Sequence, residues 1–587
     1  MNKNEEIAIK RKLLGLSQSG QFVESEKLAL YLVEHISTDL EVWFALAQIQ
    51  RALGKHDLAL QSFERVAARK SNIRAQALAA IIPLCIKLGL LDKGVNAAKK
   101  QLKIEPQSAL PHYQLARMLW KLQHLHQAAE HFKKAILFDP NNAEYNLFWA
   151  EVLAYIGDAN STLAQFEHTK TLDTDNDEIH LKHLLFLNYC DELSNEDVFR
   201  CHVEFGKRLE ARYAKVESFP VKECARKIRV AYVSTDFMRH SVSYFFLPIA
   251  KGYDNNQFEL YCYSDMPASK ADEVTEQLKA CSTLWRDVHP LTNEQLYTQI
   301  RNDEIDILVD LAGYGGMKSR MPVFARKAAP VQVTYLAYPN TTGLTRMDYR
   351  IVDEFTDPVG VAETLSSEKL ARLKNSFLCY EPEEVSPSIE SLPADNTGVF
   401  TFGSFNNYLK ITDDVIDAWS KILSQVPNSR IYVKASVFAD HGLQKDFAAR
   451  CKSVGIERKR LLLSSLIIDK QSHLSKYNQV DIHLDTYPYN GTTTTLEAMW
   501  MGVPTVTWTG ESHRSRVGNS IMSNLGLADY IAHTKEEYID LAVSKANDLD
   551  VLRTVRAESR ARISESAIMD NKGFVKELEN FYRRSMK

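Results

Sequence analysis

The sequence predicts two kinds of fold in one chain: a superhelix of helical repeats, followed by an α/β part made of two doubly wound domains. Two observations predict this. In the first third of the chain, a pattern of small, aromatic and helix-ending residues recurs every 34 or 35 residues. After Pro220, short runs rich in β-branched and aromatic residues alternate with helical stretches instead. A chain of 587 residues is long enough for three or four domains.

The helical repeat is clearest around Ala116, which is followed by Ala128, Phe132, Ala135 and Pro140 at 12, 16, 19 and 24 residues. Similar residues fill the same positions in neighbouring periods: Ala47, Gly54, Ala59, Phe63 and Val66 before it, and Ala150, Gly157 and Phe166 after it. Small residues let two helices approach closely, Phe fills the gap to the next pair, and Gly or Pro ends a helix. The pattern resembles the tetratricopeptide repeat, in four or five copies over residues 6–205. Such repeats bind peptides or partner proteins and perform no chemistry.

Two sets of short β-rich runs follow the repeats, and a linker separates them. The first set is Ile228–Ser234, Phe258–Ser264, Ile305–Asp310, Val331–Leu336 and Tyr349–Asp353. The linker, residues 381–395, carries five acids, no bases and three prolines. The second set is Val399–Phe402, Arg430–Val433, Leu461–Leu463, Val480–Leu484 and Thr505–Thr507. With a first linker at 206–227, the sequence predicts Rossmann-like domains at 228–380 and 396–587, the second ending in helices. Ligands of such sheets bind beyond the carboxyl ends of the strands.

The composition is that of an ordinary globular protein and excludes several classes. The 71 basic and 75 acidic residues give a net charge of −4, which favours neither nucleic acid nor an anionic membrane as a partner. No apolar run approaches the ~20 residues that span a bilayer, so we expect no membrane insertion. The eight cysteines form no Cys-x-x-Cys pair, which argues against a zinc cluster. Scattered reduced thiols and the lack of an apolar signal core predict a cytoplasmic protein.

The loop between the strand ending near Asp485 and the helix starting at Thr492–Thr495 is suited to an anion. A helix start offers backbone N–H groups and the positive end of the helix dipole, which bind phosphate. Glu497 could accept hydrogen bonds from ribose hydroxyls. The alternative is an ordinary Thr N-cap, which needs one hydroxyl rather than four. The chain has neither Gly-x-x-x-x-Gly-Lys nor Gly-x-Gly-x-x-Gly, so ATPase and dinucleotide functions lose support.

Two further loops follow expected strands. The loop 403–412 places Lys410 where it could reach an anion in the cleft, although a lone lysine before a helix is usually a solvated charge. The loop 234–241 places Asp236, Arg239 and His240 together. A histidine there could act as a base near neutral pH, or be structural.

At these loops the chain resembles the family of protein O-GlcNAc transferases and plant SPINDLY proteins. In that family, tetratricopeptide repeats precede an inverting glycosyltransferase of the GT-B fold. The resembling segments are collinear through the second half of the chain: Ala231–His240, Asp310–Tyr314, Arg320, Ala329–Gln332, Tyr338–Gly343, Met347–Tyr349, Ser404–Lys410, Val426–Ser429 and Leu484–Thr505.

The resemblance implies roles for individual residues. It makes His240 the active-site histidine and Lys410 the lysine that contacts phosphate. Residues implied at the nucleotide sugar are Asn407, Lys470, His473, Lys476, Thr492, Thr493, Thr494 and Glu497. Within that set, the basic residues flank the base and diphosphate, the threonine hydroxyls contact the diphosphate, and Glu497 holds the ribose. Animal O-GlcNAc transferases have His where this chain has Thr492, and in this the chain is more similar to SPINDLY and bacterial members.

The function implied by the resemblance is transfer of a sugar, GlcNAc from UDP-GlcNAc, to Ser or Thr hydroxyls of proteins presented by the repeats. The Asp-x-Asp sequences at 173–175 and 548–550 lie far from the Thr-rich helix start, so we expect no metal and no other cofactor. Three alternatives stay open: GDP-fucose as donor, glucose transfer from UDP-glucose to Asn, and a repeat scaffold without activity. The group that takes the acceptor proton, and a homo-oligomer formed through the repeats, also stay open.

Overall fold

A computed structural model of the chain describes two compact units. One comprises Met1–Asp175 with Ala439–Leu443, and the other comprises Asn176–Phe438 with Gln444–Lys587. Within the described ranges, no helix combines the length and the hydropathy needed to cross a membrane. The residues that the structure describes are 3–36, 38–156, 159–213, 218–219, 226–315, 319–383, 385–467 and 469–587.

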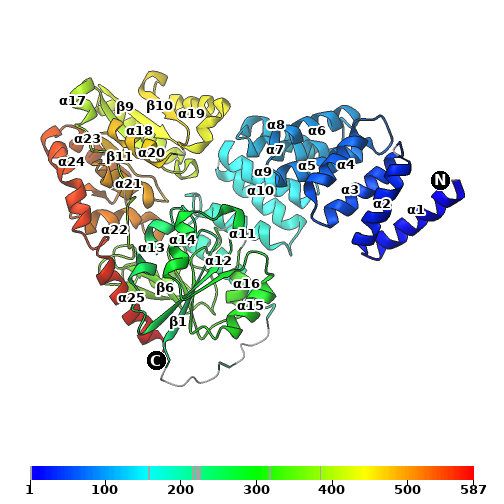
Figure 1. Ribbon diagram of the computed structural model, residues 1–587. Helices are drawn as coiled ribbons and strands as arrows, with labels where there is room; N and C mark the ends of the chain where they lie inside the picture. The colour runs from blue at the N-terminus through cyan, green and yellow to red at the C-terminus, as the bar shows by residue number, and fades with distance from the viewer. Residues whose placement is uncertain are drawn as a thin grey trace. The chain divides into compact units, whose positions relative to one another are not determined.

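The described part of the first unit consists of ten helices that form five successive hairpins (Figure 1, blue to cyan). The small and aromatic residues of the repeat form its core, and Ala116, Ala128, Phe132 and Ala135 are all fully buried. The helices are α1 (Lys3–Gln18), α2 (Phe22–His35), α3 (Leu40–Ala52), α4 (His56–Ala67), α5 (Arg74–Lys87), α6 (Leu91–Ile104), α7 (Ala109–Lys121), α8 (Leu125–Phe138), α9 (Ala143–Ile156) and α10 (Ala159–Leu172).

The glycines of the repeat separate the two helices of a hairpin. Gly20, Gly54 and Gly89 have φ between 72° and 74°, in the left-handed region that glycine adopts without strain. Gln123 takes the same position in the next hairpin with φ of 62°. Gly157, which the sequence pattern also places there, lies outside the described residues. The period in the sequence is therefore a period in the turns as well as in the core.

The helix pair α11 (Asp177–Leu187) and α12 (Asn195–Glu210) belongs to the second unit. A Cβ on Gly206 would lie only 2.1 Å from the carbonyl oxygen of Gly343, so α12 and the loop after β5 are packed backbone to backbone. The compact unit of repeats thus ends at Asp175, before the expected residue 205. That this pair is a last repeat stays a prediction. Much of the expected linker 206–227, including Pro220, lies outside the described residues.

The second unit contains two sheets, and every described strand pair in them is parallel. The first has the order β3-β2-β1-β4-β5-β6-β7 and the second the order β10-β9-β8-β11-β12-β13. The strands of the first sheet are β1 (Ile228–Ser234), β2 (Phe258–Ser264), β3 (Leu284–Asp287), β4 (Ile307–Asp310), β5 (Val331–Thr334), β6 (Tyr349–Asp353) and β7 (Lys369–Leu373). Those of the second are β8 (Phe400–Ser404), β9 (Ser429–Lys434), β10 (Leu461–Ser464), β11 (Ile482–Leu484), β12 (Thr505–Trp508) and β13 (Ile531–Ala532).

Helices connect these strands, as the alternation in the sequence predicts, and the last three helices follow strand β13. In the first domain they are α13 (Ser243–Gly252), α14 (Glu273–Cys281), α15 (Asn293–Asn302) and α16 (Met321–Ala325). In the second they are α17 (Pro393–Thr397), α18 (Asp413–Gln425), α19 (His441–Ser453), α20 (Lys470–Ser475), α21 (Thr493–Trp500), α22 (Val517–Asn524), α23 (Lys535–Ala546), α24 (Leu549–Ser564) and α25 (Asn571–Ser585).

The strand order explains where the site lies. The direction in which strands are added reverses between β1 and β4 in the first sheet, and between β8 and β11 in the second. At such a reversal the loops after the two strands diverge and leave a crevice at the carboxyl edge. The loops after β1 and β8 contain His240 and Lys410, and the loop after β11 leads to Thr492.

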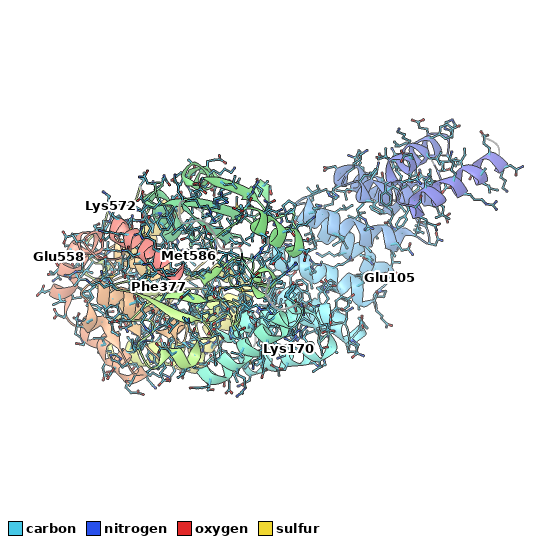
Figure 2. All side chains as sticks on the ribbon, turned by 90° about the horizontal axis from the view of Figure 1, so that it is seen from below. Glu105, Lys170, Phe377, Glu558, Lys572 and Met586 are labelled. Carbon is cyan, nitrogen blue, oxygen red and sulfur yellow. The ribbon has the colours of Figure 1, made fainter. Side chains whose placement is uncertain are left out.

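The last helix, α25, leaves the second domain and packs beside the first sheet (Figure 1, red). The hydroxyl groups of Tyr582 and Tyr232 lie 2.8 Å apart, and Glu579 accepts a 2.8 Å hydrogen bond from the backbone N–H of Asp254. The exposed side chains Glu558 on α24 and Lys572 on α25 lie at the outer surface (Figure 2). The end of the chain thus ties the two α/β domains together.

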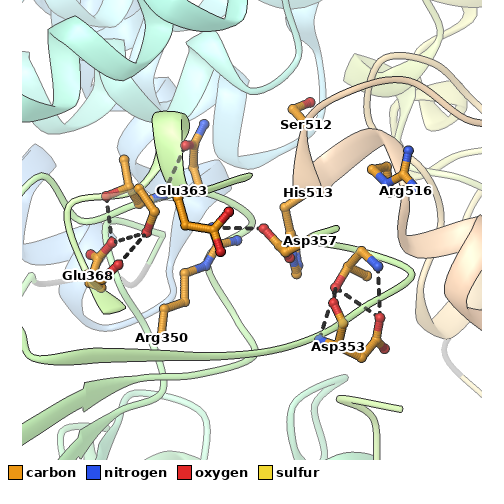
Figure 3. A network of polar contacts seen from close by, with 12 residues as sticks. Arg350, Asp353, Asp357, Glu363, Glu368, Ser512, His513 and Arg516 are labelled. Carbon is orange, nitrogen blue, oxygen red and sulfur yellow. Dashed lines mark hydrogen bonds and ion pairs between the residues drawn. The ribbon is translucent and has the colours of Figure 1, made fainter. Parts of the chain in front are cut away.

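A buried polar network joins the two domains a second time (Figure 3). The imidazole Nδ1 of His513, just before α22, lies 2.5 Å from a carboxylate oxygen of Asp357, which follows β6. Burial would raise the pKa of Asp357, but the charges of His513 and Arg350 lower it to about 2. Nearby, Ser520 on α22 donates a 2.6 Å hydrogen bond to Asp353. These contacts fasten α22 to the first domain.

Candidate active site

Loops of both α/β domains line one cavity of about 380 Å³. It brings together six of the expected site residues, His240, Asn407, Lys410, Thr492, Thr493 and Thr494. Further wall residues that the sequence analysis did not single out for the site are Tyr189, Phe245, Asn406 and Tyr489. The remaining expected residues, Lys470, His473, Lys476 and Glu497, are not among the residues that line this cavity.

Lys410 ends the short 3₁₀ turn η3 (Tyr408–Lys410), directly after β8. Its Nζ donates a 2.7 Å hydrogen bond to the backbone carbonyl of Asn490 and lies 3.6 Å from the centre of the Tyr489 ring. Burial lowers the pKa of Lys410, and the nearby carboxylate of Asp485 opposes that change. The ammonium group of Lys410 is therefore fixed at the cavity wall by these contacts. It is not the solvated lysine that the sequence analysis gave as the alternative.

Asp485, the residue after β11, shapes the turn that faces Lys410. Its carboxylate accepts hydrogen bonds from the N–H groups of Gly491 (2.7 Å) and Thr486 (2.9 Å) and from the Thr507 hydroxyl (2.8 Å). A Cβ on Gly491 would lie 2.5 Å from the Thr494 hydroxyl, so the turn has no room for a larger residue. Sequence reasoning used Asp485 only to mark the end of a strand. The sequence signal that could have identified Asp485 as a site residue is an acidic residue directly after a buried strand.

The start of α21 does not have the geometry of an ordinary N-cap. The Thr492 side chain forms no capping hydrogen bond in the described part of the chain. Thr494 instead donates a 2.6 Å hydrogen bond to the side-chain oxygen of Asn406, which belongs to the loop after β8. Thr492, Thr493 and Thr494 at the start of the helix thus line the cavity, where an anion would meet the positive end of the dipole.

His240 is held more loosely on the opposite wall. Its side chain is 44% exposed, and its Nδ1 lies 3.8 Å from a carboxylate oxygen of Asp236, at the outer limit of an ion pair. The backbone N–H of Val242 donates a 3.4 Å hydrogen bond to the same nitrogen. The imidazole is accessible from the cavity, and its contacts with the described residues are long.

Glu497 lies one turn along α21 from Thr493, in a second polar cluster. Its side chain is 5% exposed and accepts hydrogen bonds from Lys470, from Nε2 of His473 (2.8 Å) and from the Tyr477 hydroxyl (3.4 Å). Burial would raise the pKa of Glu497, but the hydrogen bond from His473 and the charge of Lys470 lower it to about 2. The Tyr477 hydroxyl shares its one proton between Glu497 and the carbonyl of Thr494, 3.2 Å away, and so connects the two parts of the site.

The other expected residues lie around these two groups. Asn407 is exposed, and its side-chain oxygen accepts a 3.1 Å hydrogen bond from the N–H of Leu409, which caps the turn that carries Lys410. Lys476 begins the 3₁₀ segment η6 (Lys476–Gln479), directly after α20. Burial lowers the pKa of Lys434, a residue at the end of β9 that sequence reasoning missed, and the charge of Lys476 acts in the same direction. The sequence signal that could have identified Lys434 is a charged residue at the end of a buried strand, as in Arg430–Lys434.

Acidic, histidine and cysteine side chains do not gather into a cation site anywhere in the described ranges: no group of three or more of them could hold a metal ion. Lysine side chains place positive charge in this region. Lys410 lines the cavity, Lys470 is paired with Glu497, and Lys470 and Lys476 act electrostatically on Lys434.

Comparison with known proteins identifies two kinds of module in the chain. The model of glycosyl transferase family 41 matches residues 211–392 and 388–578. The model of the tetratricopeptide repeat matches residues 40–72 and 111–142, which confirms the repeat in the first unit.

Curated relatives include two plant proteins named "Probable UDP-N-acetylglucosamine–peptide N-acetylglucosaminyltransferase SPINDLY". The protein of Oryza sativa subsp. japonica is 37% identical over 423 residues, which are 71% of this chain and 45% of the relative. That of Arabidopsis thaliana is 36% identical over 421 residues, 71% of this chain and 46% of the relative. The aligned part is thus less than half the length of either relative.

A solved structure is similar over most of the chain. It is a mutant of the Thermobaculum terrenum O-GlcNAc transferase, with 32% sequence identity and a TM-score of 0.81. The similarity covers 88% of this chain and 98% of that one. It confirms the expected fold, a helical repeat superhelix followed by two parallel-sheet α/β domains.

Proposed function

Because the chain belongs to glycosyl transferase family 41, we propose that it is an inverting protein glycosyltransferase that transfers GlcNAc from UDP-GlcNAc to Ser or Thr hydroxyls of proteins. The names of the SPINDLY relatives and of the bacterial structural neighbour support this donor and this type of acceptor. The observation that carries the proposal is the cavity in which Lys410, the start of α21 and His240 meet.

The chemistry assigned to the cavity is a single displacement at the anomeric carbon of the donor. The acceptor oxygen attacks that carbon, the bond to the diphosphate breaks, and the hydroxyl proton passes to a base, for which we propose His240. Lys410 and the backbone N–H groups at the start of α21 stabilise the charge that develops on the leaving diphosphate. One preorganised donor of this kind contributes about 3–4 kcal/mol, and a general base about 10²–10⁴-fold in rate.

The nucleoside end of the donor is assigned to the cluster around Glu497. Its carboxylate is ionised and would accept hydrogen bonds from the ribose hydroxyls in place of one of its present partners. Lys470, His473 and Lys476 would flank the base and the diphosphate. Asn407, Thr492, Thr493 and Thr494 would contact the diphosphate and the sugar at the cavity wall.

The roles of partners and cofactors complete the proposal. The tetratricopeptide repeats present the protein acceptor, because stacked hairpins of this kind offer an extended groove for peptides. The same repeats offer a surface through which a homo-oligomer would form. The reaction proceeds in the cytoplasm and uses no metal or other cofactor, since the cations of the site are supplied by lysine side chains and a helix start.

The test of this function is turnover of three donors by the purified full-length protein. UDP-GlcNAc, GDP-fucose and UDP-glucose are supplied separately with a protein extract as acceptor. Release of the nucleoside diphosphate and the mass added to acceptor peptides are measured. We expect UDP release from UDP-GlcNAc and one N-acetylhexosamine on Ser or Thr. Turnover of GDP-fucose alone would show that the proposed donor is wrong, and glucose on Asn would show that both the donor and the acceptor are wrong. No turnover of any donor would contradict the proposal that the protein is an enzyme.

A variant that lacks residues 1–175 tests the role of the repeats. We expect it to retain donor hydrolysis, because the cavity is formed by the second unit alone. Transfer to protein acceptors should fall strongly. Equal labelling of the acceptor proteins by both forms would contradict acceptor presentation by the repeats.

A further inference from the structure

Lys434 is buried at the edge of the proposed nucleotide site, and the mechanism above gives it no task. It is the last residue of β9 and is 3% exposed. Its ammonium group lies 5.1 Å from the centre of the Phe405 ring and is hydrogen-bonded to Nδ1 of His473. In the described ranges, no carboxylate forms an ion pair with it.

This placement is unfavourable for folding. A buried ammonium group without an ion-pair partner loses its hydration, and replacing such a charge with an apolar side chain is often neutral or stabilising. Burial lowers the pKa of Lys434 to about 8; the charges of Lys470 and Lys476 act in the same direction, and that of Glu497 opposes them. The folded protein is thus less stable with lysine at this position than it would be with methionine, which points to a role in binding.

The hydrogen bonds around His473 indicate what that role is. A neutral imidazole carries its proton on one nitrogen, and the partner of the other nitrogen decides which. Lys434 can only donate, so Nδ1 of His473 accepts and the proton lies on Nε2. The Nε2–H then donates the 2.8 Å hydrogen bond to Glu497. In the opposite tautomer, a lone pair on Nε2 would face the carboxylate.

We propose that Lys434 is a positioning residue for the nucleotide: it fixes the tautomer and ring orientation of His473, and through His473 it holds Glu497 ready for the ribose. This inference rests on the proposed function, because it assumes that a nucleoside diphosphate binds at Glu497.

The replacement Lys434→Met removes the donor and the charge while it keeps an unbranched side chain. We expect UDP affinity and the donor KM to worsen about 10–30-fold, with kcat within about threefold of the wild type, because uniform binding of the nucleoside end is lost. The temperature of unfolding should stay the same or rise. Lys421→Met, on the exposed face of α18, is the matched control and should change none of these quantities.

A double-mutant cycle on UDP binding tests whether Lys434 acts through His473. Calorimetric titration of UDP into the wild type, Lys434→Met, His473→Ala and the double variant gives four affinities. We expect the double variant to bind within about twofold of His473→Ala, because the second replacement then has nothing left to orient. Unchanged affinity in Lys434→Met, or two losses that multiply independently, would overturn the inference. A wild type that binds neither UDP nor GDP would overturn the proposed function as well, so the two failures are distinguishable.

A measurement on the wild type keeps the test independent of variant folding. The ¹⁵N chemical shifts of His473 distinguish an unprotonated Nδ1 that accepts a hydrogen bond from a protonated one. We expect the Nε2–H tautomer in the wild type, and a mixture of tautomers in Lys434→Met. A proton on Nδ1 of a neutral His473 in the wild type would overturn the inference.

Discussion

The carboxyl edges of the two sheets differ in how firmly they hold their functional side chains. At the first edge, His240 is 44% exposed and lies 3.8 Å from Asp236. At the second edge, Lys410 donates a 2.7 Å hydrogen bond to the backbone carbonyl of Asn490. Glu497 is 5% exposed and accepts hydrogen bonds from a lysine, a histidine and a tyrosine. Charges that must be neutralised in the reaction need a preorganised partner. A wall that admits a protein acceptor needs open space. Under the proposed function, the difference means that the side chains assigned to the donor are positioned in advance, whereas the wall assigned to the acceptor is open until the substrate binds.

Replacing Lys410 should have the largest effect, because it removes a held charge from the preorganised edge. We expect Lys410→Ala to lower donor turnover by about 10³-fold while the protein remains folded. Steady-state release of UDP from UDP-GlcNAc measures the turnover, and a thermal unfolding curve shows whether the variant is folded. Lys421→Ala on α18 serves as the control and should turn over normally. Normal turnover in Lys410→Ala, or a loss that follows unfolding, would remove the phosphate role.

The loss of His240 should be smaller and of a different kind. We expect His240→Ala to lower kcat about 10²-fold, at the lower end of what a general base contributes, because the contacts that Asp236 and Val242 make with the exposed imidazole are long. UDP affinity should stay within about twofold of the wild type. Should UDP binding weaken as much as kcat, His240 would belong to the donor site, and the contrast between the two edges would fail.

Glu497→Gln sharpens the comparison within the second edge. It leaves Lys470 and His473 without their carboxylate, so we expect the donor KM to rise about tenfold with a small change in kcat. The variant should also unfold at a lower temperature. The pKa of Glu497 is held at about 2, so its contribution to stability is complete above the usual Glu range and is lost as the pH falls toward 2. The stability difference from the wild type should therefore be equal at about pH 6 and pH 8, and smaller at about pH 3.

Removing divalent metal should have the smallest effect. Because lysine side chains and a helix start provide the positive charge of the donor site, we expect UDP release from UDP-GlcNAc to persist in excess EDTA. The same assay with added Mn²⁺ should give the same rate. A loss of activity in EDTA that Mn²⁺ restores would show that the second edge is not complete without a metal.

Local signals in the sequence were sufficient for most of the fold. The ten expected strands all form, because their β-branched and aromatic runs are buried in the sheets. Strands β3, β7 and β13 were missed: Leu284–Asp287 is only partly buried, Lys369–Leu373 has two basic residues and an exposed start, and Ile531–Ala532 is two residues long. The return of α25 to the first domain was not predictable either, since it depends on tertiary packing such as that of Tyr582 on Tyr232.

The candidate site was predictable where chemistry lies in one loop and not where it depends on contacts between loops. Lys410 and Thr492–Thr494 each follow a strand, and the structure brings them to one cavity. Lys434 resembled any charged residue at a strand end, because only the fold shows that it is buried beside His473. The role of Asp485 depends likewise on Gly491 and Thr507, which the turn and the neighbouring strand bring to it.

Equilibrium binding of UDP to the wild type, Lys410→Ala and His240→Ala tests most directly the claim that the second sheet alone holds the donor. Calorimetric titration gives three dissociation constants under identical conditions. The account predicts that Lys410→Ala weakens UDP binding by at least about tenfold, since a held charge next to the diphosphate is lost. It predicts that His240→Ala binds UDP as the wild type does. Undiminished binding in Lys410→Ala, or a loss in His240→Ala of similar size, would contradict it.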